Sequence, residues 1–333
     1  MRRGAIIRIT GIGIVVAILV TLVAVLIPWL PTSASKEMDR IEFVYWFATV
    51  ICIAIFALVM AVIIYSVWAF RSPPEDESDG PPIHGNTSLE IAWTVVPAIL
   101  VIAIGVLSAF VLSKNSDAGP NPLNVKVFAQ QFAWRFVYPD DGGVKSGELV
   151  LPLGRGIKFE MQSADVIHSF WIPAMGQKQD LVPGIKTSIV VTPTRTGVFP
   201  LVCTELCGVG HATMRATVRV VSQADFTAWV KERQDGGGNP ATAAALFTSA
   251  GCAGCHIFTP AGSKGEIGPN LDTLVSVAQK AGRDPADYVR EAIVNPGKVI
   301  APGYQDGVMP PSFGETLSAK EIGALVAYLT GAK

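Results

Sequence analysis

The chain has 333 residues, of which half are hydrophobic and only 16% are charged. The length is enough for two or three domains, and the apolar bias argues against one large soluble enzyme and favours membrane-spanning segments. A formal net charge of −1 gives no indication of a nucleic-acid partner. With five Cys and four His in the chain, each potential metal ligand can be considered individually.

Three uncharged apolar stretches come first, at Ile9–Ser35, Phe43–Phe70 and Ile91–Ser113. Each is long enough to cross a bilayer as a helix, which takes about 20 residues. We therefore predict a transmembrane helical hairpin within residues 36–118. A basic start and the small residues that end the first stretch also describe a secretory signal, so residues 1–35 are predicted to be a signal peptide or a signal-anchor helix.

Residues 119–222 carry short β-type runs that alternate with turns, as at Asp141-Gly142-Gly143. This pattern predicts an all-β sandwich or barrel. Ser222 and Asp225 then have the spacing of a helix cap. Residues 223–240 are accordingly predicted to be a short helix followed by a Gly-rich linker.

Helical patterns return in the last segment, residues 241–333. They cover 241–250, 285–294 and 318–330. Ser318 and Glu321 form a capping-box pattern at the start of the last of these helices. The segment is therefore expected to be an all-α domain.

Sulfur and imidazole ligands are concentrated between Cys203 and Met214, with Cys207 and His211 between them, and His168 lies on an earlier β-type segment. Thiolate, thioether and imidazole together favour copper. A mononuclear blue-copper site needs one cysteine, whereas a pair of thiolates can bridge a pair of copper ions. Each ion then takes one histidine, and Met214 and a backbone carbonyl remain as weak ligands. Sharing one electron between both ions keeps the geometric change on reduction small, which suits electron transfer.

From the sequence alone, the same residues are also compatible with simpler roles. Cys203 and Cys207 would form a disulfide outside the cell. Alternatively, the two cysteines and two histidines would hold a structural zinc ion. His168 by itself would be an ordinary core or surface histidine.

The pattern Cys-x-x-x-Cys-x-x-x-His-x-x-Met, preceded by His168-Ser169-Phe170, resembles the CuA domain of cytochrome c oxidase subunit II. Leu89–Pro97 resembles the start of the second helix of that family, and the resemblance covers roughly residues 37–222. It implies a cupredoxin-like barrel that carries binuclear copper and associates with subunit I of an oxidase. It also implies bridging ligands Cys203 and Cys207, terminal ligands His168 and His211, and weak ligands Met214 and the carbonyl of Glu205.

In that family the glutamate at the position of Glu205 also reaches a magnesium ion at the interface with subunit I, and Asp180 lies where a nearby acidic residue is expected. The resemblance departs at an aromatic run, typically Gln-Trp-Tyr-Trp, whose first Trp accepts electrons from soluble cytochrome c. Here the run is Gln131-Phe132-Ala133-Trp134. Phe132 and Trp134 are therefore the electron-accepting candidates, although both are also expected as core residues of the barrel. The change argues against docking of a free cytochrome and favours a tethered donor.

Cys252, Cys255 and His256 form the C-x-x-C-H signature of covalent haem attachment. Met309 lies in a later Gly/Pro-rich loop and offers a thioether, and Met/His ligation raises the potential of a haem. Residues 241–333 resemble a class I cytochrome c, which implies that the carbonyl of Pro269 bonds the axial histidine. The alternatives are a redox-active C-x-x-C disulfide and a Met309 that only fills the core.

Glu90 lies at the predicted cytoplasmic start of the third apolar stretch. An acid near a helix N-terminus is stabilised by the helix dipole, which alone would explain its position. The resemblance to subunit II instead implies that Glu90 opens a proton path into subunit I.

The predicted fold is a multidomain membrane protein with N-terminal transmembrane helices, a cupredoxin-like CuA barrel and a C-terminal cytochrome c domain that binds haem c. This layout resembles the caa3-type oxidases. The resemblance implies an electron-accepting subunit of a proton-translocating oxidase in a bacterial plasma membrane, with both redox domains on the extracytoplasmic side. Cytochrome c or a bc1-type complex would be the donor. The alternatives are the CuA subunit of a nitric-oxide or nitrous-oxide reducing complex and a copper-assembly protein.

Overall fold

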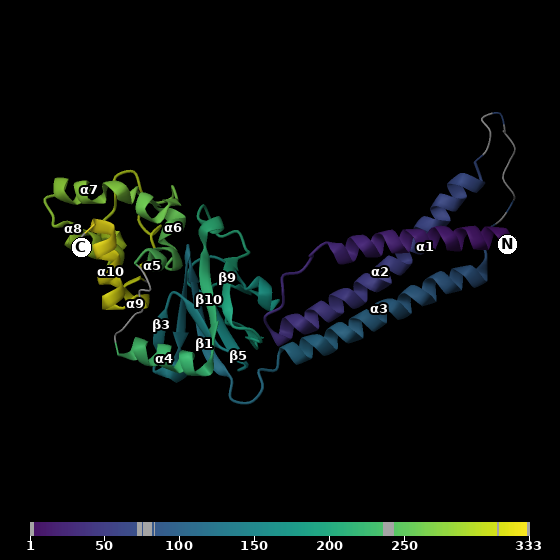
Figure 1. The fold of residues 1–333 in the computed structure, drawn as a ribbon, viewed down its shortest axis with the longest axis horizontal. Helices are drawn as coiled ribbons and strands as arrows, with labels where there is room; N and C mark the ends of the chain where they lie inside the picture. Colours follow the sequence, from purple (N-terminus) through teal and green to yellow (C-terminus); the bar gives the residue numbers. More distant parts are fainter. Residues whose placement is uncertain are drawn as a thin grey trace. The chain divides into compact units, whose positions relative to one another are not determined.

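The computed structural model describes residues 3–71, 75, 82, 84–235, 243–311 and 313–331. The chain forms two compact units, one of Met1–Thr32 with Asp39–Lys114 and one of Ser33–Met38 with Asn115–Lys333. Figure 1 labels the elements of both. The glycines of the predicted linker, Gly236-Gly237-Gly238, lie outside the described residues.

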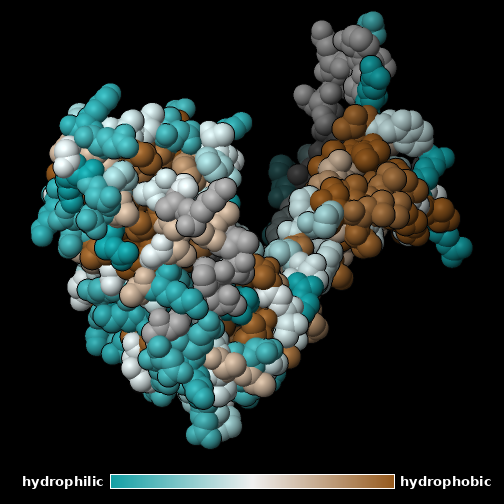
Figure 2. All heavy atoms as spheres, turned by 60° about the vertical axis from the view of Figure 1, so that its left-hand side comes forward, coloured by the Kyte–Doolittle hydropathy of each residue, from teal (hydrophilic) through white to brown (hydrophobic). Residues whose placement is uncertain are grey.

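The first unit consists of apolar helices. They are α1 (Arg3–Leu26), α2 (Lys36–Ala69) and α3 (Thr87–Asn115). All three are long and apolar enough to cross a membrane. Their large hydrophobic side chains are mostly exposed, and Figure 2 shows these as a brown surface on the helices. The first helix ends before Pro28 although the apolar stretch continues to Ser35, because proline cannot donate a helical hydrogen bond.

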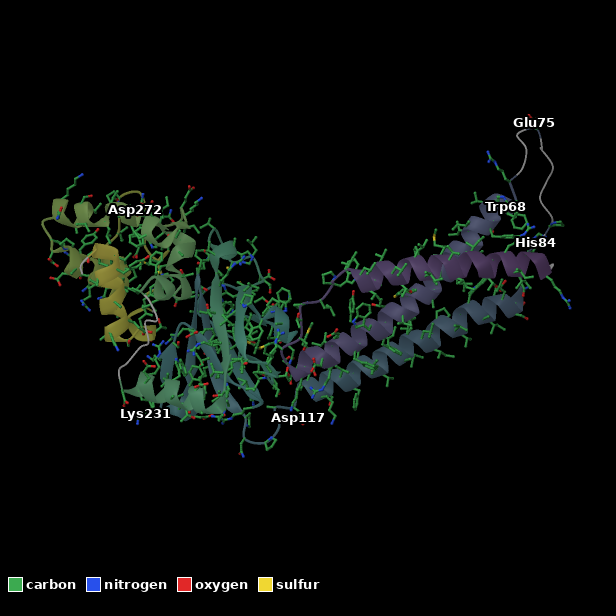
Figure 3. The ribbon with its side chains drawn as sticks, in the orientation of Figure 1. Trp68, Glu75, His84, Asp117, Lys231 and Asp272 are labelled. Carbon is green, nitrogen blue, oxygen red and sulfur yellow. The ribbon has the colours of Figure 1, made fainter. Side chains whose placement is uncertain are left out.

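Helices α1 and α2 pack against each other through small residues and a cation–π contact. A Cβ added at Gly13 would lie 3.5 Å from Ala61 Cβ, and the Arg8 guanidinium lies 5.1 Å from the centre of the Trp68 ring. Going from the Arg8–Trp68 contact to the Gly13–Ala61 contact, the residue number increases on α1 and decreases on α2. The two helices are therefore antiparallel. Figure 3 shows Trp68, Glu75 and His84 at the same end of this unit. Small residues let apolar helices approach closely where lipid offers no hydrophobic driving force.

A sandwich of two five-stranded sheets forms the centre of the second unit. One sheet has the order β3-β2-β1-β5-β8 and the other β4-β10-β9-β6-β7. The strands are β1 (Leu123–Gln130), β2 (Ala133–Tyr138), β3 (Val144–Ser146), β4 (Leu149–Pro152), β5 (Ile157–Ser163), β6 (His168–Trp171), β7 (Lys178–Leu181), β8 (Thr187–Val191), β9 (Gly197–Cys203) and β10 (Arg215–Val221). Alternate side chains of β1 and β5 point into one core, which includes Phe136, Phe159 and Phe170. The predicted all-β domain is thereby confirmed as a cupredoxin-like sandwich.

Helix α4 (Gln223–Gln234) closes one end of that core. Its predicted cap is present, because the Ser222 hydroxyl accepts a hydrogen bond from the Asp225 N–H. Phe226 and Trp229 are buried, and the Trp229 ring lies edge-on to Tyr138 at 5.1 Å. The helix therefore packs with the sandwich and not with the following domain alone.

The C-terminal domain is helical apart from a small hairpin of β11 (Ile257–Phe258) and β12 (Ser263–Lys264). Its helices are α5 (Ala243–Ser249), α6 (Cys252–Cys255), α7 (Leu274–Lys280), α8 (Pro285–Val294), α9 (Phe313–Thr316) and α10 (Ala319–Thr330). The predicted capping box of Ser318 and Glu321 starts α10. Single 3₁₀ turns also occur at Pro139–Asp141, Pro173–Met175, His211–Thr213, Thr259–Ala261, Leu271–Thr273 and Pro296–Lys298.

Candidate metal centre

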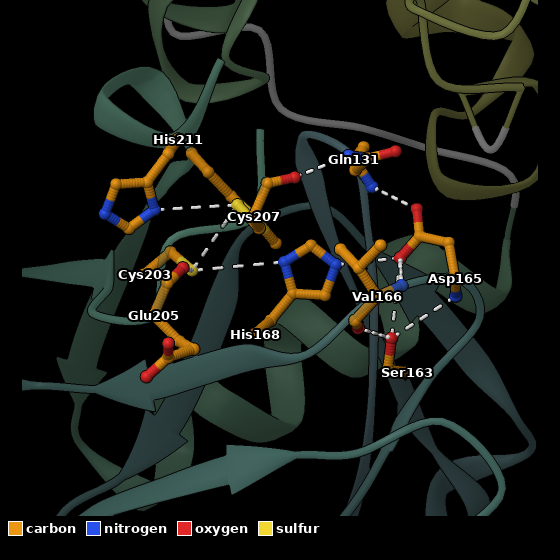
Figure 4. Close-up of polar contacts among 10 residues, drawn as sticks. Gln131, Ser163, Asp165, Val166, His168, Cys203, Glu205, Cys207 and His211 are labelled. Atoms are coloured by element: carbon orange, nitrogen blue, oxygen red, sulfur yellow. Dashed lines mark hydrogen bonds and ion pairs between the residues drawn. The ribbon is translucent and has the colours of Figure 1, made fainter. Parts of the chain in front are cut away.

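Strand pairing brings the first cysteine to the predicted histidine. Strands β6 and β9 run antiparallel with Phe170 opposite Cys203, so the start of β6 reaches the end of β9. His168 is fully buried there, and its Nδ1 lies 3.9 Å from Cys203 Sγ. The Sγ atoms of Cys203 and Cys207 are also 3.9 Å apart, which is too far for a disulfide bond. These three residues form a buried group able to hold a metal ion (Figure 4).

The remaining predicted ligands converge on the same pair of sulfurs. His211 Nδ1 lies 3.5 Å from Cys207 Sγ, and Met214 Sδ lies 3.8 Å from it. The backbone carbonyl of Glu205 is 3.3 Å from Cys203 Sγ. The sulfur pair of Cys203 and Cys207 is thus approached by a donor atom from each of the other four predicted copper ligands.

Without metal, the pKa values of the Cys203 and Cys207 thiols are shifted in opposite directions. Burial opposes ionisation of Cys203, but hydrogen bonds from His168 and neighbouring groups outweigh it and lower its pKa to about 6. Burial and the negative charge of Cys203 raise the pKa of Cys207 to about 12. One thiolate is thus favoured at neutral pH, and the second needs a cation close by.

Asp165, together with Gln131 of the aromatic run, orients these ligands. Asp165 Oδ1 is 2.8 Å from His168 Nε2, which leaves Nδ1 for the metal side. The other Asp165 oxygen accepts the Gln131 N–H at 2.7 Å, and the Gln131 side chain donates to the carbonyl of Cys207 at 2.5 Å. Burial opposes the charge on Asp165, but these donors hold the pKa of its carboxyl below the usual range. A carboxylate behind a histidine ligand fixes the tautomer and orientation of the ring.

The two aromatic candidates lie in different positions around this site. Trp134 is buried, and its ring lies edge-on to the His168 imidazole with centroids 6.3 Å apart. Phe132 is partly buried and packs directly on Gly210, the residue before His211. Trp134 is therefore part of the core and also next to the candidate ligand His168. A core role and a role in electron acceptance are compatible for this residue.

The C-x-x-C-H motif forms a second site in the C-terminal domain. Cys252 and Cys255 bound the short helix α6, and His256 follows it and is 9% exposed. His256 Nδ1 donates a hydrogen bond to the carbonyl of Pro269 at 2.8 Å, which leaves Nε2 available as a ligand. Burial lowers the pKa of His256 and so favours the neutral imidazole that binds metals. It also raises the pKa of the Cys252 thiol to about 12.

A cavity of about 840 Å³ adjoins the motif. Cys252, Cys255, His256 and Met309 all line it. Its volume is in the range of cavities that hold cofactors and other large ligands. The predicted attachment, axial and sulfur ligands thus surround a single space.

Family models match the chain in three consecutive segments. The transmembrane domain of cytochrome c oxidase subunit II matches residues 23–111, its periplasmic domain residues 144–221, and cytochrome c residues 240–333. Cytochrome c oxidase subunit 2 of Alkalihalophilus pseudofirmus is 30% identical over 327 residues, which cover 91% of each chain.

The chain belongs to the cytochrome c oxidase subunit 2 family. The subunit of Synechocystis sp. is also 30% identical, over 60% of this chain and 74% of its own. Among solved structures, the periplasmic domain of subunit II of cytochrome oxidase from Bradyrhizobium japonicum is 31% identical over 36% of this chain and 98% of its own, with a TM-score of 0.34.

Membership in the cytochrome c oxidase subunit 2 family makes this chain an electron-accepting subunit of an oxidoreductase complex that contains other oxidase subunits. The nitric-oxide and copper-assembly alternatives are not favoured. The family also implies CuA copper and haem c. The residues present fit both groups, because soft sulfur and imidazole donors converge at the first site and the second has attachment, axial and cavity residues together.

Glu90 and Asp180, the two remaining residues to which the family resemblance assigns a role, each accept a hydrogen bond. Glu90 lies in the first turn of α3, where its side chain accepts the Asn86 N–H at 3.1 Å. Asp180, on β7, accepts the Ser169 hydroxyl at 2.7 Å. The contact of Glu90 is one that a purely structural helix-start residue would also make.

Proposed function

We propose that this subunit 2 accepts electrons at the Cys252–His256 site and passes them to subunit I through the site around Cys203 and Cys207. One observation carries the proposal. The six candidate copper ligands converge on one sulfur pair in the same compact unit that holds the cavity of the C-x-x-C-H motif. Haem c and binuclear copper, when bound, supply one-electron redox chemistry.

The protein groups have distinct tasks in this proposal. Cys203, Cys207, His168 and His211 would hold the copper, with Met214 and the Glu205 carbonyl as weaker ligands. Asp165 holds the His168 ring in place through its 2.8 Å hydrogen bond. In the other domain Cys252 and Cys255 would hold the haem covalently and His256 and Met309 would be its iron ligands, with the Pro269 carbonyl orienting His256.

The test is metal analysis of the full chain purified in detergent. We expect copper and iron in a ratio of about two, because a bridged thiolate pair holds a pair of copper ions. The electron paramagnetic resonance spectrum should show an unpaired electron coupled to both copper nuclei. Zinc in place of copper, or a disulfide between Cys203 and Cys207 in metallated preparations, would contradict the proposal.

The arrangement in the membrane follows from the same proposal. We assign residues 1–35 to a signal-anchor helix or signal peptide, 36–118 to a transmembrane hairpin, 119–222 to the copper domain, 223–240 to a short helix and linker, and 241–333 to the cytochrome domain. Both redox domains would face the extracytoplasmic side of a bacterial plasma membrane. The external donor would be cytochrome c or a bc1-type complex, and it would reduce the cytochrome domain.

A magnesium ion shared with subunit I is a further part of the proposal. The Glu205 side chain is exposed while its carbonyl faces Cys203, so the carboxylate is free to reach a partner subunit. Asp180 on β7 supplies a second acid, and it accepts a hydrogen bond from the Ser169 hydroxyl of β6. Carboxylates are the oxygen ligands that magnesium prefers.

Glu90 is proposed as the opening of a proton path into subunit I. We expect Glu90→Gln to slow proton uptake by the assembled oxidase, because the amide cannot carry a proton. The Asn86 hydrogen bond can be kept by the glutamine oxygen, so α3 should still form. The measurement is the rate of proton uptake after a flash or oxygen pulse, with copper and haem spectra recorded on the same sample. Unchanged uptake would leave Glu90 with only its role at the start of the helix.

A further inference from the structure

Three cations on the copper domain face two carboxylates on the cytochrome domain. Glu315 on α9 accepts Arg135 at 2.8 Å and Lys145 at 3.2 Å. Glu321 on α10 accepts Arg233 of α4 at 2.7 Å. Through these contacts Glu315 links α9 to β3, and Glu321 links α10 to α4. We call these contacts the interdomain ion pairs.

The sandwich places the two cations that contact Glu315, Arg135 and Lys145, on one face. Lys145 is opposite Val137 in the β2–β3 ladder, and Arg135 is two residues before Val137, so both side chains leave the sheet on the same side. The Arg135 guanidinium also lies 4.5 Å from the centre of the Phe128 ring, a cation–π contact that limits its movement. Arg135 is therefore held by a contact within the copper domain, on the same face as Lys145.

The second pair is buried. The side chains of Arg233 and Glu321 are 11% and 2% exposed. Glu321 keeps its capping-box bonds to Ser318 while it accepts Arg233, so the charge is fixed at the start of α10. A buried charge is tolerated only with a partner, which makes this contact specific to one arrangement of the domains.

The same arrangement puts the C-x-x-C-H motif on the copper loop. A Cβ at Gly254 would lie only 2.9 Å from Thr213 Cβ, and Thr213 Oγ1 is 3.9 Å from Cys255 Sγ. Thr213 lies between the candidate copper ligands His211 and Met214. Only a glycine at position 254 lets the backbones approach this closely.

We propose that the interdomain ion pairs dock the cytochrome domain with Gly254 against Thr213 and thereby set the rate of electron transfer between the two domains. The step moves one electron, which the haem iron loses and the copper pair gains, and no bond or proton changes. The inference rests on the proposed function, since it concerns the path between its two sites. The docking of the two domains, which these side-chain contacts make, does not depend on bound metal.

The test uses Glu315→Lys in the full chain, because Glu315 is 55% exposed and its replacement does not leave a buried charge unpaired. Two measurements are made. One is backbone hydrogen exchange in segments 211–215 and 252–256, in chains with and without copper. The other is the rate of intramolecular electron transfer after flash reduction of the haem, at low and high salt.

We expect faster exchange in both segments and electron transfer slower by about tenfold, since an exposed pair contributes up to about fivefold and reversal adds repulsion. Copper and haem spectra should stay unchanged. The triple variant Glu315→Lys, Arg135→Glu, Lys145→Glu should restore both quantities. Asp287→Lys makes the same charge change at an exposed site on α8 and should have no effect.

Unchanged exchange in Glu315→Lys, or a triple variant as slow as the single one, would overturn the inference. A wild-type chain without copper or haem would instead overturn the proposed function. Hydrogen exchange would still report docking in that case, so the two failures are distinguishable.

Discussion

Replacement of Cys207 by serine is expected to abolish the binuclear copper signal while leaving the haem spectrum intact. Cys207 Sγ is the atom on which the contacts converge, with Cys203, His211 and Met214 all within 3.9 Å of it. A hydroxyl does not replace a bridging thiolate, because it stays protonated near neutral pH and is a hard ligand. The remaining ligands would hold at most a mononuclear site.

The check is electron paramagnetic resonance and copper analysis of Cys207→Ser beside wild type. Cys52→Ser is the matched control, since Cys52 is exposed on α2 in the other unit. It should retain the full copper signal. A Cys207→Ser protein that keeps coupling to two copper nuclei would show that Cys207 is not a bridge.

The copper loop was predictable because its ligands are local. Five of the six lie within residues 203–214, so their spacing is visible without a fold. His168 is distant in sequence and was identified because the chain has few histidines. Asp165 and Gln131 were not predicted, since their roles depend on the distance between the loop before β6 and the β1–β2 turn.

Regular elements were predictable where their patterns were long. The Ser222 cap of α4 and the capping box and amphipathic pattern of α10 carry sequence signals of their own. Strand β6 has only four residues, three of them buried, and so shows no alternation. Helix α7, Leu274–Lys280, was not predicted. The interdomain ion pairs had no local signal, because each joins residues from two domains.

The haem site offers a test that depends on one glycine. Gly268 packs its backbone against the His256 imidazole, and a Cβ there would lie 2.5 Å from Cε1 and 2.7 Å from Nδ1. Its N–H also donates to the Cys255 carbonyl at 2.7 Å, so the backbone cannot easily withdraw. A methyl group at this position must displace the ring and weaken its hydrogen bond to Pro269.

Gly268→Ala is therefore expected to impair haem ligation strongly, with partial loss of the low-spin spectrum and binding of carbon monoxide to the reduced protein. Overpacking of this kind costs about 1–3 kcal/mol, and here the crowded group is the imidazole of His256. Gly323→Ala is the control, because a Cβ on that residue of α10 meets nothing within 4 Å and alanine favours the helix. If Gly268→Ala keeps a wild-type spectrum and potential, His256 is not held against Gly268 in the haem-bound protein, and its assignment as axial ligand loses its structural basis.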